Sequence, residues 1–207
     1  MPDLGLFPLQ LVVFPGERLP LHIFEPRYLE LVAECRELGT EFGIILAEDT
    51  RIRDVGTRAA IVEVLEQLPD GRQNIIVEGR ERFRLVELTT GRSFPTGIVE
   101  PVVDNHAPAD PAVAANALRL LQALATAVGV EVDLPQPDAP ALSFEVAARV
   151  ELALEDEQEL LELRSEPERL DRLAELLEEA ADRARLEREV HEKAKLNGKL
   201  PHHPSLP

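Results

Sequence analysis

The chain has four serines and one cysteine, the side chains that most often act as enzyme nucleophiles. A catalytic serine needs an exposed, strained turn and a nearby base, and neither Ser93 nor Ser205 lies in such a context. Ser143 and Ser165 precede helical patterns, so we expect both to cap helix N-termini. Cys35 lies on the apolar side of a predicted helix, which favours a buried and inert thiol.

Nucleotide and metal chemistry also lack their usual motifs. No segment matches the phosphate-binding loop G-x-x-x-x-G-K-[ST], and the nearest string, residues 197–200, lacks the first glycine and the hydroxyl. A single cysteine excludes sites built from several cysteines. His191, His202 and His203 lie near the C-terminus without a framework of other ligands, and His22 lies in a strand-like segment. We therefore predict no catalytic residue, no cofactor and no metal.

Three arginines alternate along a predicted strand. Arg80, Arg82 and Arg84 share one face if the strand is regular. Such a face could bind an anion, but pairing with Glu78 and Glu87 is the simpler interpretation and the one we favour. Nearby, Glu25-Pro26-Arg27 opens a predicted helix, where we expect a capping acid and a structural ion pair.

The overall charge limits the classes of partner. Lysine and arginine total 22 against 39 aspartates and glutamates, which gives a net charge of −17. Phosphate backbones and anionic lipids need a positive surface, so we expect neither nucleic acid nor membrane as a partner. No uninterrupted apolar run approaches about 18 residues, and residues 1–3 do not open a signal peptide. A cytoplasmic protein fits these observations.

Short apolar runs separated by proline and glycine turns predict strands in the first half of the chain. One helix interrupts them, beginning at Pro26 and ending at Gly39, with an apolar stripe at i, i+3, i+4 and i+7. This pattern predicts a small antiparallel barrel or pseudo-barrel. The expected strands are Leu9–Phe14, Phe42–Ala47, Ala60–Leu68, Asn74–Glu78, Arg82–Leu88 and Gly97–Val103.

The second half of the chain carries helical patterns. Ala112–Val128 has one apolar face, and the helix opened by Ser165 and Glu168 runs to about Lys195. We also expect a short helix capped by Ser143 and another with a capping box at Asp156 and Glu159. The run Glu155–Glu159 (EDEQE) should be a solvated helix start.

The change of pattern across the proline-rich stretch 101–111 marks a linker. We therefore expect a β-barrel subdomain over residues 1–103, a helical subdomain over 104–198 and a flexible tail over 199–207. The fold class is α+β, with a long last helix.

One segment is unusually rich in aromatic rings and prolines. Phe7, Phe14, Phe24 and Tyr28 fall within 22 residues, interleaved with Pro8, Pro15, Pro20 and Pro26. Rigid loops that carry rings suit a shallow apolar groove, although a small barrel also needs rings for its core. We expect most of these rings in the core and a minority in a protein-binding groove.

The same segment, FPLQLVVFPGERLPLHIFEPRYLELV (residues 7–32), closely resembles the start of the N-terminal domain of bacterial ATP-dependent Lon proteases. Further segments match in the same order: FGIIL (42–46), VGTRAAIVEV (55–64), DGRQNIIVEGRERFRL (70–85) and SEPERLDRLAELL (165–177). The resemblance implies a PUA-like antiparallel β pseudo-barrel followed by a helical bundle. The chain looks like a stand-alone domain of this type, without the ATPase and peptidase parts.

The resemblance also implies a function. In Lon this domain helps to recognise unfolded or tagged substrates, so we expect a non-enzymatic module that binds unfolded or apolar protein segments. Two alternatives stay open. One is a regulator or adaptor that docks on a Lon-type protease. The other, less favoured because of the acidic charge, is an RNA-binding PUA-like module.

Overall fold

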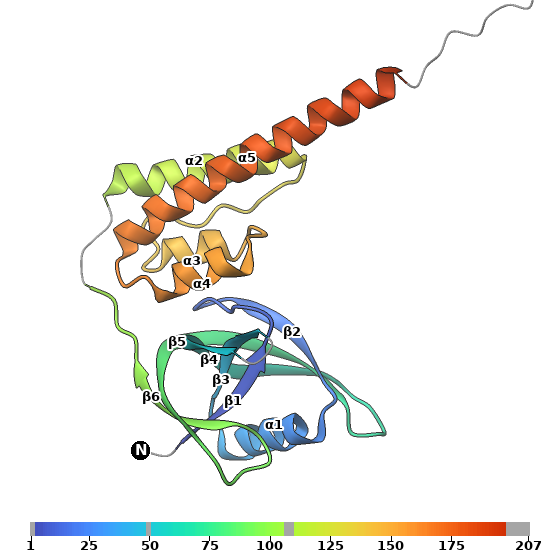
Figure 1. The fold of residues 1–207 in the computed structure, drawn as a ribbon, viewed down its shortest axis with the longest axis vertical. Coiled ribbons are helices and arrows are strands. Elements are labelled where there is room, and N and C mark those ends of the chain that lie inside the picture. The colour runs from blue at the N-terminus through green and yellow to red at the C-terminus, as the bar shows by residue number, and fades with distance from the viewer. Residues whose placement is uncertain (1–2, 49–50, 106–109, 198–207) are drawn as a thin grey trace, which may run out of the picture.

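The structure is a computed structural model that describes residues 3–48, 51–105 and 110–197, except for the side chains of residue 189 and residues 191–197. Its strands lie between residues 4 and 101, and four of the five helices follow them (Figure 1). The α+β class is confirmed, with the long last helix at the far end from the barrel. The predicted tail, residues 199–207, lies outside the described residues.

The strands close into a barrel. Their order is β2-β5-β4-β3-β1-β6, and β5 also pairs with β6, so five strands form a ring to which β2 adds beside β5. Neighbours run antiparallel, except that β1 and β3 are parallel. The strands are β1 Leu4–Leu9, β2 Arg18–Ile23, β3 Phe42–Glu48, β4 Arg51–Gln67, β5 Gln73–Thr89 and β6 Thr96–Pro101.

Two strand predictions were wrong. The run Leu9–Phe14 is no strand, because β1 ends at Leu9 and the following residues leave the sheet. A hydrogen bond of 2.6 Å from the Thr57 hydroxyl to the Val13 carbonyl holds this segment instead. The two strands expected at 74–78 and 82–88 are one strand, β5, with an irregularity opposite Thr57 and Ala59. At Gly79 a Cβ would collide with the Phe14 carbonyl, so only glycine permits this approach.

The predicted inserted helix is present as α1, Pro26–Leu38. Its buried stripe, which includes Tyr28 and Cys35, packs against the barrel core, and Gly39 ends it with a φ of 63°. The expected acid cap is wrong. Glu25 occupies the N-cap position, but its side chain makes no capping bond and pairs with Arg27 at 2.7 Å.

Helices α2 (Pro111–Val128), α3 (Leu142–Ala147), α4 (Leu154–Glu162) and α5 (Glu166–Asn197) form the second layer (Figure 1). The 32 residues of α5 span about 48 Å. By length and composition, α2 is the helix in the described part of the chain that could cross a membrane. It carries Arg119 on its exposed side and packs its apolar side into the core, as a core helix does.

The expected helix caps differ in outcome. Ser165 caps α5, since its hydroxyl accepts the Glu168 N–H at 3.4 Å. Ser143 does not cap α3, because the helix begins at Leu142 and the Ser143 hydroxyl donates to Glu166. The capping box at Asp156 was also wrong, because α4 begins two residues earlier and the Asp156 carboxylate accepts from an arginine of α5.

The segment Glu155–Glu159 lies at the start of α4, as expected, but only Glu155 and Glu159 of it are exposed to solvent. Gln158 is completely buried, and its amide nitrogen donates to the Val55 carbonyl of β4 at 3.1 Å. Glu157 is half-buried beside it. The sequence did not indicate that this run has a buried side, because the buried residue is a glutamine, which is polar.

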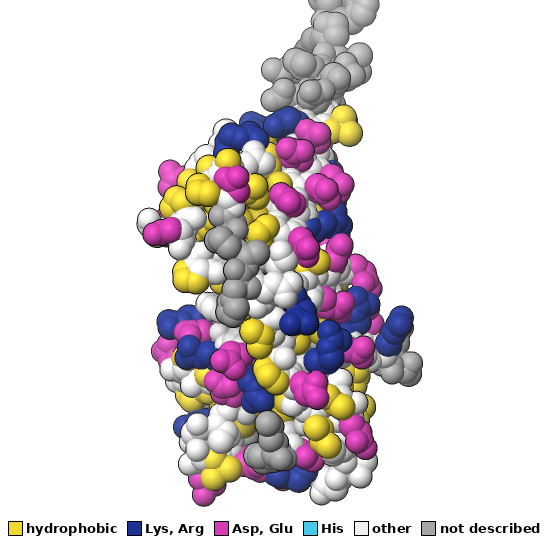
Figure 2. All heavy atoms as spheres, turned by 90° about the vertical axis from the view of Figure 1, so that its left-hand side faces the viewer, with side chains coloured by type: hydrophobic (Ala, Val, Ile, Leu, Met, Phe, Trp, Pro, Cys, Tyr) yellow, Lys and Arg dark blue, Asp and Glu magenta, His cyan; other side chains and the backbone are white. Residues whose placement is uncertain are grey.

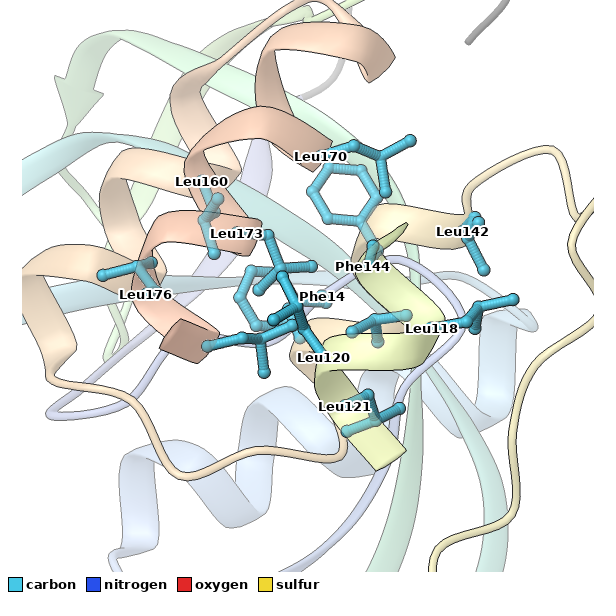
Figure 3. Packing of buried hydrophobic residues seen from close by; sticks show 14 of the residues in the cluster. Phe14, Leu118, Leu120, Leu121, Leu142, Phe144, Leu160, Leu170, Leu173 and Leu176 are labelled. Carbon is cyan, nitrogen blue, oxygen red and sulfur yellow. The ribbon is translucent and has the colours of Figure 1, made fainter. Parts of the chain in front are cut away.

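One hydrophobic cluster joins the barrel to the helices (Figure 3). Phe14, Leu46 and Val55 from the strand half belong to the same cluster as Leu121 and Leu173 from the helical half. A second cluster lies within the barrel, beneath α1. The two halves therefore share a hydrophobic core. The division into two subdomains at residue 103 stays a prediction.

Candidate protein-binding surface

Three of the four candidate rings lie in the core. Phe7 of β1 and Tyr28 of α1 are buried, and their ring centroids are 4.0 Å apart where α1 packs on the barrel. Phe14 is also buried, and its ring stacks on that of Phe144 with centroids 5.6 Å apart, between the barrel and the helices. These rings hold the fold together and present no surface to a partner.

Phe24 is the candidate ring that reaches solvent. Its exposed fraction is 60%, against 1% for the preceding Ile23. The alternation of β2 explains this, because His22 and Phe24 point outwards while Leu21 and Ile23 enter the core. The ring of Phe24 stacks against that of His22, with centroids 5.8 Å apart. The short connection between β2 and α1 thus presents a large apolar side chain on a well-defined backbone.

The His22 ring, on which Phe24 stacks, lines a shallow hollow of about 590 Å³. Pro20 of β2 contributes apolar surface, and Leu65 of β4, half-exposed, contributes the opposite part. A polar row crosses the sheet at the hollow. His22 Nδ1 lies 2.6 Å from Asn74 Oδ1, and Asn74 donates to Glu66 at 3.0 Å.

Sequence reasoning missed the part of this surface that lies outside residues 7–28. Leu65 and Asn74 flank the β4–β5 hairpin, and their proximity to His22 depends on the pairing of β2 with β5. The exposed position of Leu65 in a strand-like run was the one available signal. No alternation rule indicates which distant strand lies beside it.

A larger hollow, of about 650 Å³, lies between the helices. Leu124 and Val128 of α2 and Leu176 of α5 form its apolar parts, and Arg149 and Arg183 lie among the polar ones. Its charged side chains come from α4, α5 and the segments between α2 and α4, and it lies away from the aromatic segment at residues 7–28. We therefore place the candidate surface at β2 and the β4–β5 hairpin.

The candidate nucleophiles have structural roles in the described part of the chain. Cys35 is buried, and burial raises the pKa of its thiol, which disfavours the reactive thiolate. The Ser93 hydroxyl donates to Glu30 at 2.6 Å. Ser143 and Ser165 bond to α5, as described above. Ser205 lies outside the described residues.

The three arginines of β5 do not form one exposed face. The irregularity between Gly79 and Arg82 breaks the alternation that Arg80 would share with the other two, and the helical half covers Arg82, which is 5% exposed, while Arg80 and Arg84 face solvent. Arg80 pairs with Glu78 at 2.6 Å, as the simpler interpretation expected. The strand therefore offers no three-arginine anion site.

Metal ligands do not gather in the described residues either, where no group of three or more His, Cys, Asp or Glu side chains is placed to hold an ion. His202 and His203 lie outside the described residues. On the face drawn in Figure 2, acidic side chains spread over the helical half, and basic ones are interspersed with acidic ones over the barrel. That face offers no continuous basic surface for a polyanion.

The comparisons with known proteins agree with this architecture. The model of the ATP-dependent protease La (LON) substrate-binding domain matches residues 3–179. Lon protease of Paraburkholderia phytofirmans is 28% identical over 205 residues, which cover 89% of this chain and 25% of that protein. Lon protease of Porphyromonas gingivalis is 34% identical over 112 residues, covering 50% of this chain and 13% of that protein. The chain thus spans a quarter or less of these curated relatives.

Two solved structures have the same fold. A Lon N-terminal domain protein from Xanthomonas campestris aligns with a TM-score of 0.69 and 27% identity, covering 84% of this chain and 97% of that one. The N-terminal domain of the Mycobacterium avium complex Lon protease aligns with a TM-score of 0.70 and 19% identity, over 86% of this chain and 98% of that one. With the family match over residues 3–179, they show that the chain belongs to the family of the Lon substrate-binding domain.

Proposed function

We propose that this member of the Lon substrate-binding domain family binds exposed apolar segments of unfolded protein, without a catalytic step. The observation that carries the proposal is the exposed ring of Phe24, which stacks on His22, a residue that lines the hollow together with Pro20 and Leu65. An aromatic ring on a short, ordered connection loses little conformational entropy when a client covers it. The family match supports recognition of protein substrates.

The shape of the surface suits an extended apolar segment. The ring of Phe24 and the apolar parts of the hollow would lose water against client side chains, which is the driving force for association. The polar row of His22, Asn74 and Glu66 would border that contact, as polar groups border protein interfaces. We expect such binding to be reversible and to need neither nucleotide nor metal.

Two other interpretations are weaker on present observations. Docking on a Lon-type protease is compatible with the family, but no described surface singles out a docking face. RNA binding lacks the arginine face on which it depended, because Arg82 is buried. A cytoplasmic location and the absence of ATPase and peptidase activity stay predictions.

Replacing Phe24 by alanine tests the proposal. We expect it to weaken binding of casein, used as a natively unfolded client, by about 1–3 kcal/mol, because a partly exposed ring then no longer contacts the client. Fluorescence anisotropy of labelled casein gives the affinity, and a thermal melt of the variant shows whether the fold is intact.

Leu38→Ala is the matched control, since Leu38 is 64% exposed at the other end of α1. The proposal predicts unchanged casein affinity for this variant. Equal losses for the two variants would indicate unspecific apolar contact and contradict the assignment. Unchanged affinity of the folded Phe24→Ala variant would also contradict it.

A further inference from the structure

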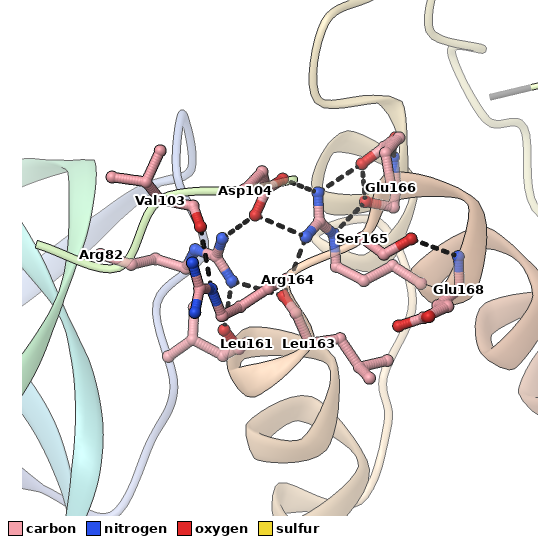
Figure 4. A network of polar contacts seen from close by, with 11 residues as sticks. Arg82, Val103, Asp104, Leu161, Leu163, Arg164, Ser165, Glu166 and Glu168 are labelled. Atoms are coloured by element: carbon pink, nitrogen blue, oxygen red, sulfur yellow. Dashed lines mark hydrogen bonds and ion pairs between the residues drawn. The ribbon is translucent and has the colours of Figure 1, made fainter. Parts of the chain in front are cut away.

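A buried group of charges lies where the barrel, the linker and the helices meet (Figure 4). Asp104, in the segment between β6 and α2, has a carboxylate that contacts two arginines from opposite halves of the chain. Its Oδ1 accepts from Arg82 of β5 and, at 3.0 Å, from Arg169 of α5. Its Oδ2 accepts a second bond from Arg169 at 2.5 Å.

The two arginines are among the most buried charged residues described. Arg82 is 5% exposed and Arg169 is 1% exposed, whereas the side chain of Asp104 is 33% exposed. The carboxylate is thus the more exposed member of the group, and the two guanidinium groups are nearly removed from solvent. A buried cation without a counter-ion is strongly unfavourable, so these arginines depend on their acidic partners.

The remaining donors of the arginines are fixed by the helical half. Arg82 donates to the carbonyls of Leu161 and Leu163, at 2.7 and 2.6 Å. Arg169 donates to the Leu163 carbonyl at 2.9 Å and to the Ser143 hydroxyl at 2.9 Å. These bonds fix both guanidinium groups in position before the carboxylate is considered.

An aromatic wall completes the arrangement. The guanidinium carbons of Arg169 and Arg82 lie 4.3 and 5.2 Å from the ring centroid of Phe144. Cation–π contact of this kind attracts a guanidinium to the face of the ring. Glu166 supplies a second carboxylate to Arg169, at 2.6 Å. Among the described residues, the acidic partner of Arg82 is Asp104.

The neighbouring positive charges favour the anionic form of Asp104. Burial alone would raise the pKa of its carboxyl, but the hydrogen bonds and positive charges of Arg169 and Arg82 outweigh burial and hold the pKa below its usual range. The carboxylate therefore stays charged at neutral pH, as a ligand of two cations.

The linker is also tied to the turn between α4 and α5. The Asn105 N–H donates to the Arg164 carbonyl at 2.7 Å, and Arg164 Nε donates to the Val103 carbonyl at 2.9 Å. The Val102 N–H donates to the Arg82 carbonyl at 3.1 Å. The residues on either side of Asp104 therefore contact both halves of the chain.

We propose that Arg82, Arg169 and Phe144 form a carboxylate-binding site for which Asp104 is the built-in ligand, and that its occupancy fixes the barrel against the helices. The site is defined by two pre-positioned guanidinium groups, an aromatic wall and access from solvent. A small free carboxylate has the chemistry to replace the Asp104 side chain when that side chain is removed.

Asp104→Ala, with sodium acetate as the probe, tests this site in the full chain. Amide hydrogen exchange of peptides covering residues 102–105 and 161–169 reports the linker contacts. We expect exchange at least about tenfold faster in the variant, because local opening of the linker becomes easier. Acetate should slow it towards the wild-type rate, and sodium chloride at equal ionic strength should not.

Two further variants separate the site from a general effect of charge. Asp104→Asn keeps the shape but not the charge, so exchange should rise and acetate should have no effect, because the amide fills the site. Asp70→Ala removes an exposed aspartate that pairs with Arg72 at 2.7 Å. It should leave amide exchange in both peptides, 102–105 and 161–169, at the wild-type rate.

The outcomes distinguish the proposal from its alternatives. Wild-type exchange in both Asp104 variants, or equal effects of acetate and chloride on Asp104→Ala, would overturn it. If Asp104→Ala does not fold in chloride, folding upon addition of acetate supports the site, and failure to fold in acetate contradicts it.

Discussion

Glu157 lies in the first turn of α4, half-buried, and close enough to Glu17 for the two carboxylates to repel each other. Burial and this repulsion raise the pKa of Glu157 to about 7. Burial also raises the pKa of Glu17, although its carboxylate accepts the Phe14 N–H at 2.8 Å. Two acids with raised pKa values therefore meet at the boundary between barrel and helices.

The raised pKa of Glu157 makes stability depend on pH. Below about pH 4.5 the carboxyl is protonated in both the folded and the unfolded chain, so ionisation does not change the free energy of unfolding. Between that pH and about 7 the unfolded chain loses the proton first, so stability falls as pH rises. Above about 7 the loss is complete.

Glu157→Gln should therefore stabilise the protein by about 1–2 kcal/mol at pH 8, a value reduced from the full shift because the group is partly solvated. The gain should disappear below about pH 4.5. Urea unfolding at several pH values measures it, and Glu178→Gln, which removes an exposed carboxylate of α5, is the control and should not stabilise the protein by this amount at pH 8. A gain that is constant with pH would contradict the assignment to ionisation.

At the residue scale, the sequence predicted the aromatic segment but not the exposure of each ring. Phe7, Phe14 and Tyr28 are buried, and Phe24 is exposed. The four look alike in sequence because each stands beside a proline or an apolar residue. Their different exposure follows from the phase of β2 and from the helices that cover Phe14, neither of which local spacing contains.

At the scale of elements, α5 depends on its first residues. The Ser165 hydroxyl accepts the Glu168 N–H, and the helix it opens supplies Leu170, Leu173 and Leu177 to the shared core. A serine at this position satisfies a backbone donor that otherwise has no partner at a helix N-terminus.

Ser165→Ala should cost about 1 kcal/mol of stability, because the first turn of α5 loses this bond. The midpoint of thermal unfolding, followed by circular dichroism, measures the loss. Replacing Ser93, whose hydroxyl contacts only the exposed Glu30 among described residues, by alanine should change stability by less than about 0.5 kcal/mol. Equal midpoints for the two variants would contradict the cap.

The type of each helix or strand was easier to predict from the sequence than the contacts between elements. The periodic stripes of α1, α2 and α5 and the apolar run of β3 predict those elements because each one buries a face within its own length. The irregularity that unites two predicted strands into β5 depends instead on the approach of the Phe14 backbone to Gly79. Contacts so distant in sequence leave no local pattern.

At the scale of the whole molecule, the change from strands to helices suggested two subdomains joined by a linker. The structure adds a shared hydrophobic cluster, in which Phe14 stacks on Phe144 and the completely buried Gln158 bonds to the Val55 carbonyl. Interfaces of this kind couple the unfolding of the parts that they join. The two halves should therefore unfold together.

Phe14→Ala tests this coupling, since the ring belongs to the barrel sequence but packs among the helices. Removing a buried phenylalanine should cost about 3–5 kcal/mol. The chain has one tyrosine and no tryptophan, so the fluorescence of Tyr28 reports the barrel core alone, whereas far-ultraviolet circular dichroism reports chiefly the helices. Both signals should shift by the same amount in urea, and Phe24→Ala should move neither. A fluorescence midpoint that stays at the wild-type value while the helical signal shifts would show two independent units, because the barrel would then be stable without the helices.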